Sequence, residues 1–358
     1  MFLVGRMIRI YTIKDLTDWL VDGLGNGLSE SIISKTRAWA FINNPCADDT
    51  TPAVAVLFEG DETKGYAAVF PERFEHFSQK IYWGSTFFVD AYMRGKGCGA
   101  KLLAGLEDSL DGIYATTQTP PSSSAIFKKL GAQETWFPEY WFKLLKFNPA
   151  KGNHKQLKRY ANHLHPSWAF QHAKRIKWCN SFRYRLEYCS FIDDDTFLFM
   201  QKHRQNDVMM RSRKMLNWML AYPFLQTVVL QEKAYPNKNY FSCYKTDFCH
   251  YAVKVYDEND FLTGVYIFKY SGGEANLLYL YYDEKAKDLV MASFYEHLIR
   301  MEAVRLRTTH REFVSFVKRY SLPFLNLTES KLNLCAPGVL VVPEGVTIQG
   351  GDGDMFVI

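Results

Sequence analysis

The sequence predicts an α/β protein with mixed central sheets flanked by helices, arranged as two domains. Apolar runs of strand length alternate with segments whose apolar residues recur at helical spacing, a pattern typical of strands connected by helices. The length of 358 residues favours two domains rather than one. A shift of 192 positions places part of the first half on the second half without a gap, which indicates an internal repeat.

The first half is predicted to contain a strand, two helices, a hairpin and a strand–loop–helix–strand crossover. The charged turn 59–64 marks the hairpin, because it separates two β-branched and apolar runs. In order, we expect strand 7–12, helices 15–24 and 30–41, strands 53–58 and 65–70, a strand ending at Val89, helix 100–110, strand 113–118, a helix opened by Pro120-Pro121-Ser122, and a closing strand pair at 134–136 and 140–147.

The second half repeats this crossover. Under the shift of 192, strand residues 87–89 fall on 279–281 and helix 100–110 falls on 292–302. Upstream of it, runs 251–256 and 264–270 flank a polar turn and predict another hairpin.

The glycine-rich stretch Arg94-Gly95-Lys96-Gly97-Cys98-Gly99 lies between a predicted strand and a predicted helix. This arrangement presents backbone N–H groups and the positive end of a helix to an anion. Glycine is required where φ is positive or where a ligand comes too close for a Cβ atom. A Walker A loop is excluded because no Gly-Lys-Ser/Thr ends the turn, and the glycine spacing does not fit a dinucleotide-binding fingerprint.

The stretch resembles the acyl-CoA loop of the GNAT N-acetyltransferases, Arg/Gln-x-x-Gly-x-Gly/Ala. Val89 lies five residues before Arg94, where this family usually has a valine that ends its fourth strand. Residues 122–131 (SSSAIFKKLG) are similar to the helix before the family's Leu-Gly turn. The resemblance covers about residues 5–147 and implies the GNAT fold, acetyl-CoA as the cosubstrate, and direct transfer of the acetyl group to an amine.

The resemblance also implies which residues bind the cosubstrate. The phosphates would accept hydrogen bonds from backbone N–H groups of the loop, and the pantetheine would pair with the strand backbone before it. The expected cosubstrate-binding residues are Phe88, Val89, Arg94, Gly95, Lys96, Gly97, Cys98, Gly99 and Ala100. The backbone amide at Val89 is the expected oxyanion donor.

No catalytic acid or base is identified from the sequence. The family often has a tyrosine four residues before the glycine of its Leu-Gly turn, and Phe127, which has no proton to donate, occupies that position. The other candidates, each better explained by a structural role, are Tyr82, Ser85, Thr86 and Tyr140. A chain of water molecules could replace a dedicated base. The thiol of Cys98 is expected to pack inward rather than to react.

The second half is expected to bind no cosubstrate. Under the shift, Arg94 and the three glycines become Ala286, Lys287, Leu289 and Met291, with the acids Asp283, Glu284 and Asp288 around them. Side chains and negative charge at these positions would repel a pyrophosphate. The predicted organisation is therefore a GNAT acetyltransferase domain at 1–148, a basic linker at 149–185 and a degenerate GNAT-like domain at 186–358.

Residues 151–185 hold nine Lys or Arg and no Asp or Glu, interleaved with histidines and aromatic residues. This segment is either a solvated helix pair between the domains or a basic wall that faces an anionic substrate or cofactor.

Three functions are compatible with these patterns. The first is an acetyl-CoA-dependent N-acetyltransferase acting on an amine of a small molecule, sugar or peptide. The second is a relative of the Fem-type aminoacyltransferases, which use aminoacyl-tRNA and for which the basic segment would suit the tRNA. The third is a non-catalytic protein that binds CoA. Nucleic acid is otherwise not expected as a partner, and the acceptor and the oligomeric state are not identified.

The cysteines and the apolar runs indicate the cellular compartment of the protein and whether it binds a metal or a membrane. Seven cysteines are scattered without the spacing of a zinc site, which favours reduced thiols in a cytoplasmic protein without a metal. No run approaches 18 apolar residues, so no membrane partner is expected.

Overall fold

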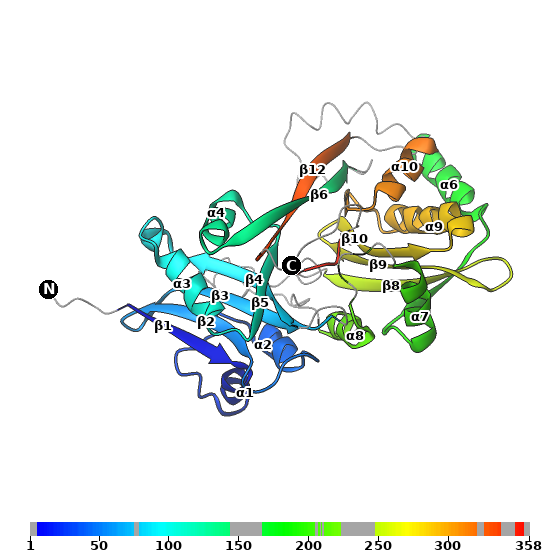
Figure 1. The fold of residues 1–358 in the computed structure, drawn as a ribbon. Helices are drawn as coiled ribbons and strands as arrows, with labels where there is room; N and C mark the ends of the chain where they lie inside the picture. Colours follow the sequence, from blue (N-terminus) through cyan, green and yellow to red (C-terminus); the bar gives the residue numbers. More distant parts are fainter. Residues whose placement is uncertain are drawn as a thin grey trace.

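The computed structural model describes residues 6–74, 79–143, 167–204, 207, 209, 211–222, 248–320, 326–337 and 348–353. Within these residues, twelve strands form one continuous mixed sheet with helices on both faces (Figure 1). The strand order is β1-β2-β3-β4-β5-β12-β6-β11-β10-β9-β8-β7. The expected α/β class, with mixed sheets flanked by helices, is confirmed.

The first half contains the predicted order of elements. They are β1 Arg6–Thr12, α1 Ile13–Asp22, α2 Lys35–Ile42, β2 Pro52–Glu59, β3 Glu62–Glu72, β4 Lys80–Val89, a 3-10 helix η1 Ala91–Met93, α3 Cys98–Glu107, β5 Gly112–Thr117, α4 Pro121–Lys129 and β6 Ala132–Lys143. Strands β1 to β4 pair antiparallel in sequence order, and β5 pairs parallel to β4.

The second half begins with α6 Ser167–Asn180, β7 Arg185–Cys189, α7 Asp194–His203 and α8 Arg213–Ala221. The hairpin and crossover follow as β8 Cys249–Tyr256, β9 Leu262–Ser271, β10 Glu274–Tyr282, η4 Glu284–Ala286, α9 Lys287–Arg300, β11 Arg305–Thr308, α10 Arg311–Arg319 and β12 Asn326–Pro337.

Local sequence signals set the ends of several helices. Thr12 caps the start of α1 in a capping box with Asp15, and the helix stops at Gly23, which has a φ of 69°. Ser212 caps α8 by accepting a hydrogen bond from the backbone N–H of Met215. These signals fix the two ends of α1 and the start of α8.

The internal repeat is real, but the shift of 192 is one residue short. Three pairs of equivalent points show this: the starts of η1 and η4, the starts of β5 and β11, and the ends of α3 and α9. In each pair the second point lies one position beyond the place that the shift gives it. In the corrected alignment Lys287 stands at the position of Arg94. Asp288, Val290 and Ala292 replace the three glycines, so the conclusion that the second half lacks the loop is unchanged.

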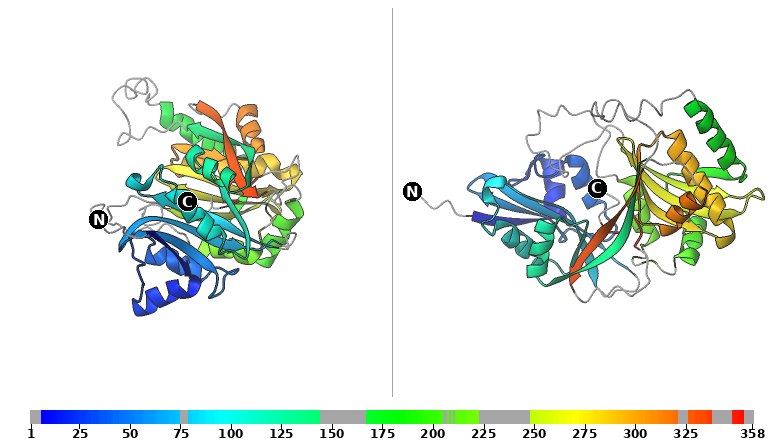
Figure 2. Two further views of the ribbon diagram at one scale, coloured as in Figure 1. Left: turned by 60° about the vertical axis from the view of Figure 1, so that its left-hand side comes forward. Right: turned by 90° about the horizontal axis from the view of Figure 1, so that it is seen from above.

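The last strands of the two halves are exchanged. Strand β12 inserts between β5 and β6, and β6 lies between β12 and β11 (Figures 1 and 2). The predicted strand pair at 134–136 and 140–147 is therefore wrong. Residues 132–143 form one strand, and its partners come from the other half of the chain. No local signal marks such a pairing, because register depends on which distant apolar face the strand covers.

One hydrophobic core runs across both halves on the sheet face that carries α1, α2, α7 and α8. Helix α8 belongs to the second half in sequence but packs on the first, where Trp218 donates its indole N–H to the carbonyl of Ala40 at 2.7 Å. On the opposite face, α3 and α4 cover the first half, whereas α9 and α10 cover the second. The two halves are thus joined by a shared core as well as by exchanged strands.

Candidate active site

The glycine loop adopts a backbone that requires glycine. Gly95 and Gly97 have φ angles of 76° and 74°, and Gly97 is the N-cap residue of α3. Helix α3 begins at Cys98, and the first turn of any helix has N–H groups without carbonyl partners in the same helix. The loop therefore directs these N–H groups and the positive helix end toward one place.

The loop side chains add positive charge at the edge of this place. Arg94 and Lys96 are both exposed, and the Nε of Arg94 donates to the carbonyl of Val89 at 3.0 Å. The ammonium group of Lys96 lies 3.4 Å from the ring centroid of Tyr92. The thiol side chain of Cys98 is buried in the core under α3, as expected.

A cleft of about 630 Å³ opens beside the loop. Eight of the nine predicted cosubstrate-binding residues line it, and Lys96 is the one that does not. Helix α4 forms the other wall with residues that the sequence analysis did not assign to the site: Ser122, Ser123, Ile126 and Lys129. The family-like helix pattern at 122–131 was the available signal for this wall.

Strands β4 and β5 separate next to this cleft. Their parallel pairing ends with Trp83 opposite Ala115, after which β4 continues to Val89 while Thr116 and Thr117 of β5 pair with β12. The register between β3 and β4 shifts at Ser85, which is an extra residue in β4. The buried hydroxyl of Ser85 has no hydrogen-bond partner among the described residues. We call the space between the strand ends the β4/β5 gap.

The two candidate tyrosines lie away from the gap. The hydroxyl of Tyr82 donates to Asp111, before the start of β5, and burial raises the pKa of Tyr82 above its ordinary value. Tyr140 lies opposite Thr308 of β11 and packs in the core of the second half.

Phe127 and Thr86 differ in their surroundings. Phe127 is buried against Tyr114, with ring centroids 5.3 Å apart, so it supports α4. Thr86 is half-buried on β4 immediately after Ser85.

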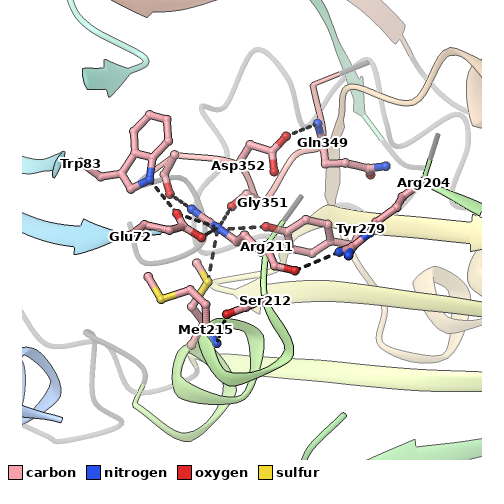
Figure 3. Close-up of polar contacts among 12 residues, drawn as sticks. Glu72, Trp83, Arg204, Arg211, Ser212, Met215, Tyr279, Gln349, Gly351 and Asp352 are labelled. Atoms are coloured by element: carbon pink, nitrogen blue, oxygen red, sulfur yellow. Dashed lines mark hydrogen bonds and ion pairs between the residues drawn. The ribbon is translucent and has the colours of Figure 1, made fainter. Parts of the chain in front are cut away.

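A buried polar cluster includes Trp83, the last residue of β4 that pairs with β5 (Figure 3). Glu72, near the end of β3, accepts the indole N–H of Trp83 at 2.6 Å. The Nε of Arg211 donates to the two carboxylate oxygens of Glu72 at 2.8 and 3.1 Å. The remaining guanidinium N–H groups of Arg211 reach the hydroxyl of Tyr279 at 2.9 Å and the carbonyls of Gly351 and Gly353 at 2.5 Å.

This cluster is not predicted from the sequence, because its members are far apart in the chain. The available signal was the glycine-rich run Gly350-Gly351-Asp352-Gly353, since glycine permits close approach of two backbones. A Cβ atom at Gly353 would lie 2.6 Å from Cγ2 of Thr117, the last residue of β5. The run therefore reaches the β4/β5 gap from the second half.

The corresponding gap in the second half is filled by the chain itself. Strands β10 and β11 pair only over Glu274–Asn276 and Arg305–Arg307. Beyond them, the N–H of Gly351 donates to the carbonyl of Leu278 at 2.9 Å. Among the described residues, the second half thus has neither the glycine loop nor an open gap.

The described part of the basic segment lies away from the cleft. Helix α6 packs against α9, at the end of the second half remote from α3 (Figures 1 and 2). Lys174 and Lys177 on this helix are exposed. Residues 151–166 are outside the described residues. The interpretation of α6 as a wall facing the substrate is therefore not supported, and a solvated face fits its position.

In the described ranges, no group of three or more His, Cys, Asp and Glu side chains is arranged to hold a metal ion. No helix in the described part of the chain is long and apolar enough to cross a membrane.

No family model matches the chain, and no curated protein matches it. Among solved structures, N-myristoyltransferase from Saccharomyces cerevisiae with bound myristoyl-CoA aligns over 99% of this chain and 83% of its own, with 9% identity and a TM-score of 0.52. The two α/β halves of this chain therefore share the fold of that structure over nearly the whole chain.

Two further structures are similar at lower TM-scores. A tandem GNAT protein from the clavulanic acid biosynthesis pathway aligns over 93% of this chain and 98% of its own, at 12% identity and a TM-score of 0.48. A putative acetyltransferase from Pyrococcus horikoshii aligns over 93% and 90%, at 12% identity and a TM-score of 0.45.

Proposed function

We propose that the chain is an acyl-CoA-dependent N-acyltransferase that transfers an acetyl group from acetyl-CoA to an amine of a small molecule, sugar or peptide. The observation that carries the proposal is the cleft of about 630 Å³, in which the glycine loop, the first turn of α3 and the free end of β4 meet beside the β4/β5 gap. A pyrophosphate needs the glycine loop and the first turn of α3. An extended pantetheine needs the free end of β4, and a thioester needs the β4/β5 gap.

The residues fit the parts of acetyl-CoA. The phosphates would bind at the first turn of α3, with Arg94 and Lys129 supplying positive charge on opposite walls of the cleft. The pantetheine amides would pair with the backbone of Phe88 and Val89, which have no β5 partner. The thioester would then lie in the β4/β5 gap, where backbone N–H groups of β4 can stabilise an oxyanion.

The reaction would be direct attack. The lone pair of an uncharged amine attacks the thioester carbon, the C–N bond forms, and the C–S bond breaks with its electron pair going to sulfur. The nitrogen gives up one proton to solvent, so that the products are a neutral amide and CoA. Binding both reactants at one gap supplies proximity, which is a large part of the acceleration of such transfers.

We further propose residues 1–148 as the acetyl-CoA-binding domain, 149–185 as a basic linker and 186–358 as a domain without a cosubstrate. The exchanged strand β12 would complete the sheet of the first domain, and the run 348–353 would supply part of the acceptor side of the site.

Calorimetric titration with acetyl-CoA tests the proposal directly. We expect one molecule bound per chain, competition by CoA, and thiol release in the presence of amines. Gly99→Val should abolish binding, because its Cβ atom would lie 3.0 Å from the ring of Phe87 in the cleft wall. Gly105→Ala in the same helix should leave binding intact, since its Cβ atom would be 3.6 Å from Ile8, an ordinary contact.

The two alternative functions, a Fem-type aminoacyltransferase and a CoA-binding protein, predict different results in binding and thiol-release assays. Thermal stabilisation by total tRNA that weakens steeply with salt would favour the Fem-type function. Acetyl-CoA binding without thiol release toward any amine would favour a CoA-binding protein, for which Phe127 in place of a tyrosine is the supporting observation. A stoichiometry of two would contradict the loss of the site from the second half.

A further inference from the structure

A second cleft, with a volume of about 590 Å³, is lined by residues of α4, β6, β11 and β12 and by the chain that follows β5. Helix α4 lies against β6 and β12 and separates this cleft from the one beside the glycine loop (Figure 1). Ser123 and Ile126 line the first cleft, whereas Ser124 and Lys128 line the second. The two clefts share no lining residue in the described part of the chain, so the proposed acetyl transfer leaves the second one without a role.

The second cleft follows a free edge of strand β12. This strand pairs with β6 along its whole length, Asn326–Pro337, but with β5 only at Leu334 and Cys335. Among the described residues, no strand pairs with the remainder of that edge, residues 326–332. Residues 326–331 are half-buried or exposed. A sheet edge of this kind presents unpaired backbone groups to any extended chain that comes beside it.

The backbone groups that face the free edge can be identified. The carbonyl of Asn333 accepts the N–H of Gln118 at 3.1 Å, so the backbone of Asn333 is directed toward the edge and away from β6. The pairing of β12 with β6 has no register shift, and the direction of the backbone groups alternates along an antiparallel ladder. Lys331 and Glu329 therefore also direct their N–H and carbonyl groups at the free edge.

Side chains on the α4 face of this strand pair line one side of the cleft. Asn333 stands opposite Trp136, and Lys331 is the next residue of β12 on the same face. The face is the one that carries α4, because Glu134, two residues before Trp136, accepts the hydroxyl of Ser124 at 3.0 Å. Trp136 and Lys331 are both exposed and both line the cleft.

Side chains on the opposite face line the same cleft. Leu332, Glu139 and Trp141 belong to this face by the alternation of β12 and β6, and Arg307 stands opposite Trp141 on β11. A cleft that is lined from both faces of a sheet passes around the strand edge. An extended peptide suits such a cleft, because its own side chains point alternately to the two faces.

The charge of the cleft favours an acidic peptide. Five ionisable side chains line it, and three of them are cationic. Both carboxylates are already paired, Glu134 with Lys128 at 2.5 Å and Glu139 with the Nε of Arg307 at 2.5 Å. Lys331 has no ion-pair partner in the part of the chain that the structure describes. One uncompensated positive charge therefore lies directly on the free edge.

We propose that the free edge of β12 is a docking site for an extended, acidic peptide segment of a partner protein. The segment adds to the sheet as a strand in line with β5 and forms backbone hydrogen bonds with Lys331 and Glu329. Its acidic side chain pairs with the ammonium group of Lys331 on the α4 face, and an apolar neighbour packs on the ring of Trp136. This site does not depend on the proposed acyl transfer.

The probes are three pools of fluorescently labelled octapeptides with both ends blocked. The first pool has one fixed glutamate among Val, Thr, Phe and Ser, the second has lysine in its place, and the third repeats the first with N-methyl groups on alternate residues. Binding to the full chain is measured by fluorescence anisotropy. The variants are Lys331→Pro, which removes the N–H at the free edge but no ladder bond to β6, and Lys331→Gln, which removes only the charge.

We expect the glutamate pool to bind at least about tenfold more tightly than the other two pools. Lys331→Pro should lower its affinity at least about tenfold, because the proline ring blocks the added strand. Lys331→Gln should lower it only about two- to fivefold, the usual effect of an exposed ion pair. Saturating acetyl-CoA should leave the affinity unchanged, since the two clefts are separate.

Four results would overturn the inference. They are the absence of binding by the glutamate pool, equal binding of the N-methylated pool, displacement of the peptide by acetyl-CoA, and unchanged affinity in Lys331→Pro. Thermal unfolding checks that Lys331→Pro is folded, and the N-methylated pool decides the case on the wild type if it is not. A dimer of the wild type in sedimentation that Lys331→Pro abolishes would assign the edge to a second copy of the chain and would also overturn the inference.

Discussion

Glu72 of the first half and Arg211 of the second form an ion pair that is completely buried, with the Nε of Arg211 at 2.8 and 3.1 Å from the two carboxylate oxygens. The pair connects the end of β3 to the residues before α8 and to the glycine-rich run at 350–353. Because each ion is desolvated, each depends on the other for its charge and its hydrogen bonds. The relative placement of the two halves at the β4/β5 gap therefore depends on this contact.

Removing one partner of this pair should destabilise the protein strongly. We expect Arg211→Met to lower the free energy of unfolding by about 3–5 kcal/mol, because it leaves the carboxylate of Glu72 buried without a cation. Urea unfolding measures the change. The double variant Glu72→Gln/Arg211→Met should recover part of the loss, and a double variant as unstable as the sum of the single variants would contradict this coupling.

The left-handed backbone at Gly97 should be required for acetyl-CoA binding. Gly97→Val should abolish binding measured by calorimetry and cost about 1–2 kcal/mol of stability, because a β-branched residue disfavours a φ of 74°. Gly23→Val is the matched control, since Gly23 has a φ of 69° and, like Gly97, has nothing within 4 Å of a Cβ atom. It should show a similar stability loss with normal binding. Normal binding by Gly97→Val would show that the loop does not need this conformation.

Neither candidate tyrosine should act as the general acid. Tyr82→Phe and Tyr140→Phe should each lower kcat by less than about tenfold, well below the 10²–10⁴-fold effect of a positioned acid or base. The reason is their position, because Tyr82 points to Asp111 and Tyr140 lies in the core of the second half. Thiol release with methoxyamine measures the effect. A larger loss in one variant, with acetyl-CoA binding intact, would identify that tyrosine as the acid.

Asp207 should make the protein less stable as the pH rises from 4 to 6. Burial raises the pKa of Asp207 from its ordinary 3.8 to about 6, although hydrogen bonds from Gln349 and Tyr281 oppose the shift. The folded state then binds this proton more tightly than the unfolded state. The protonated carboxyl of Asp207 therefore contributes to stability below about pH 4, and this contribution is lost as the pH rises through 6. The difference of about two pKa units corresponds to about 3 kcal/mol.

His310 has the opposite effect on stability over an overlapping pH range. The dependence of wild-type stability on pH therefore does not show the effect of Asp207 alone. Burial lowers the pKa of His310 to about 3, and its contribution to stability is lost as the pH falls. The comparison is therefore between the wild type and Asp207→Asn, by urea unfolding from pH 4 to 7. The variant should gain stability relative to the wild type as the pH rises. A constant difference would show that the pKa of Asp207 is ordinary.

The local features of the site could be predicted from the sequence. The positive φ of Gly95 and Gly97 and the start of α3 after them depend on neighbouring residues only. The loss of the loop from the second half is local in the same way. An error of one residue in the repeat did not change that conclusion, because no glycine stands at these positions in either alignment.

The tertiary structure alone decided what surrounds the loop. The exchange of β6 and β12, the approach of Gly353 to Thr117 and the burial of Asp352 each join residues that are far apart in the chain. A charged residue such as Glu72 or Arg211 is ordinarily expected at the surface, and only its distant partner makes burial possible. Backbone conformation is set by neighbouring residues, whereas strand pairing and the burial of charge are set by whichever remote segment completes the core.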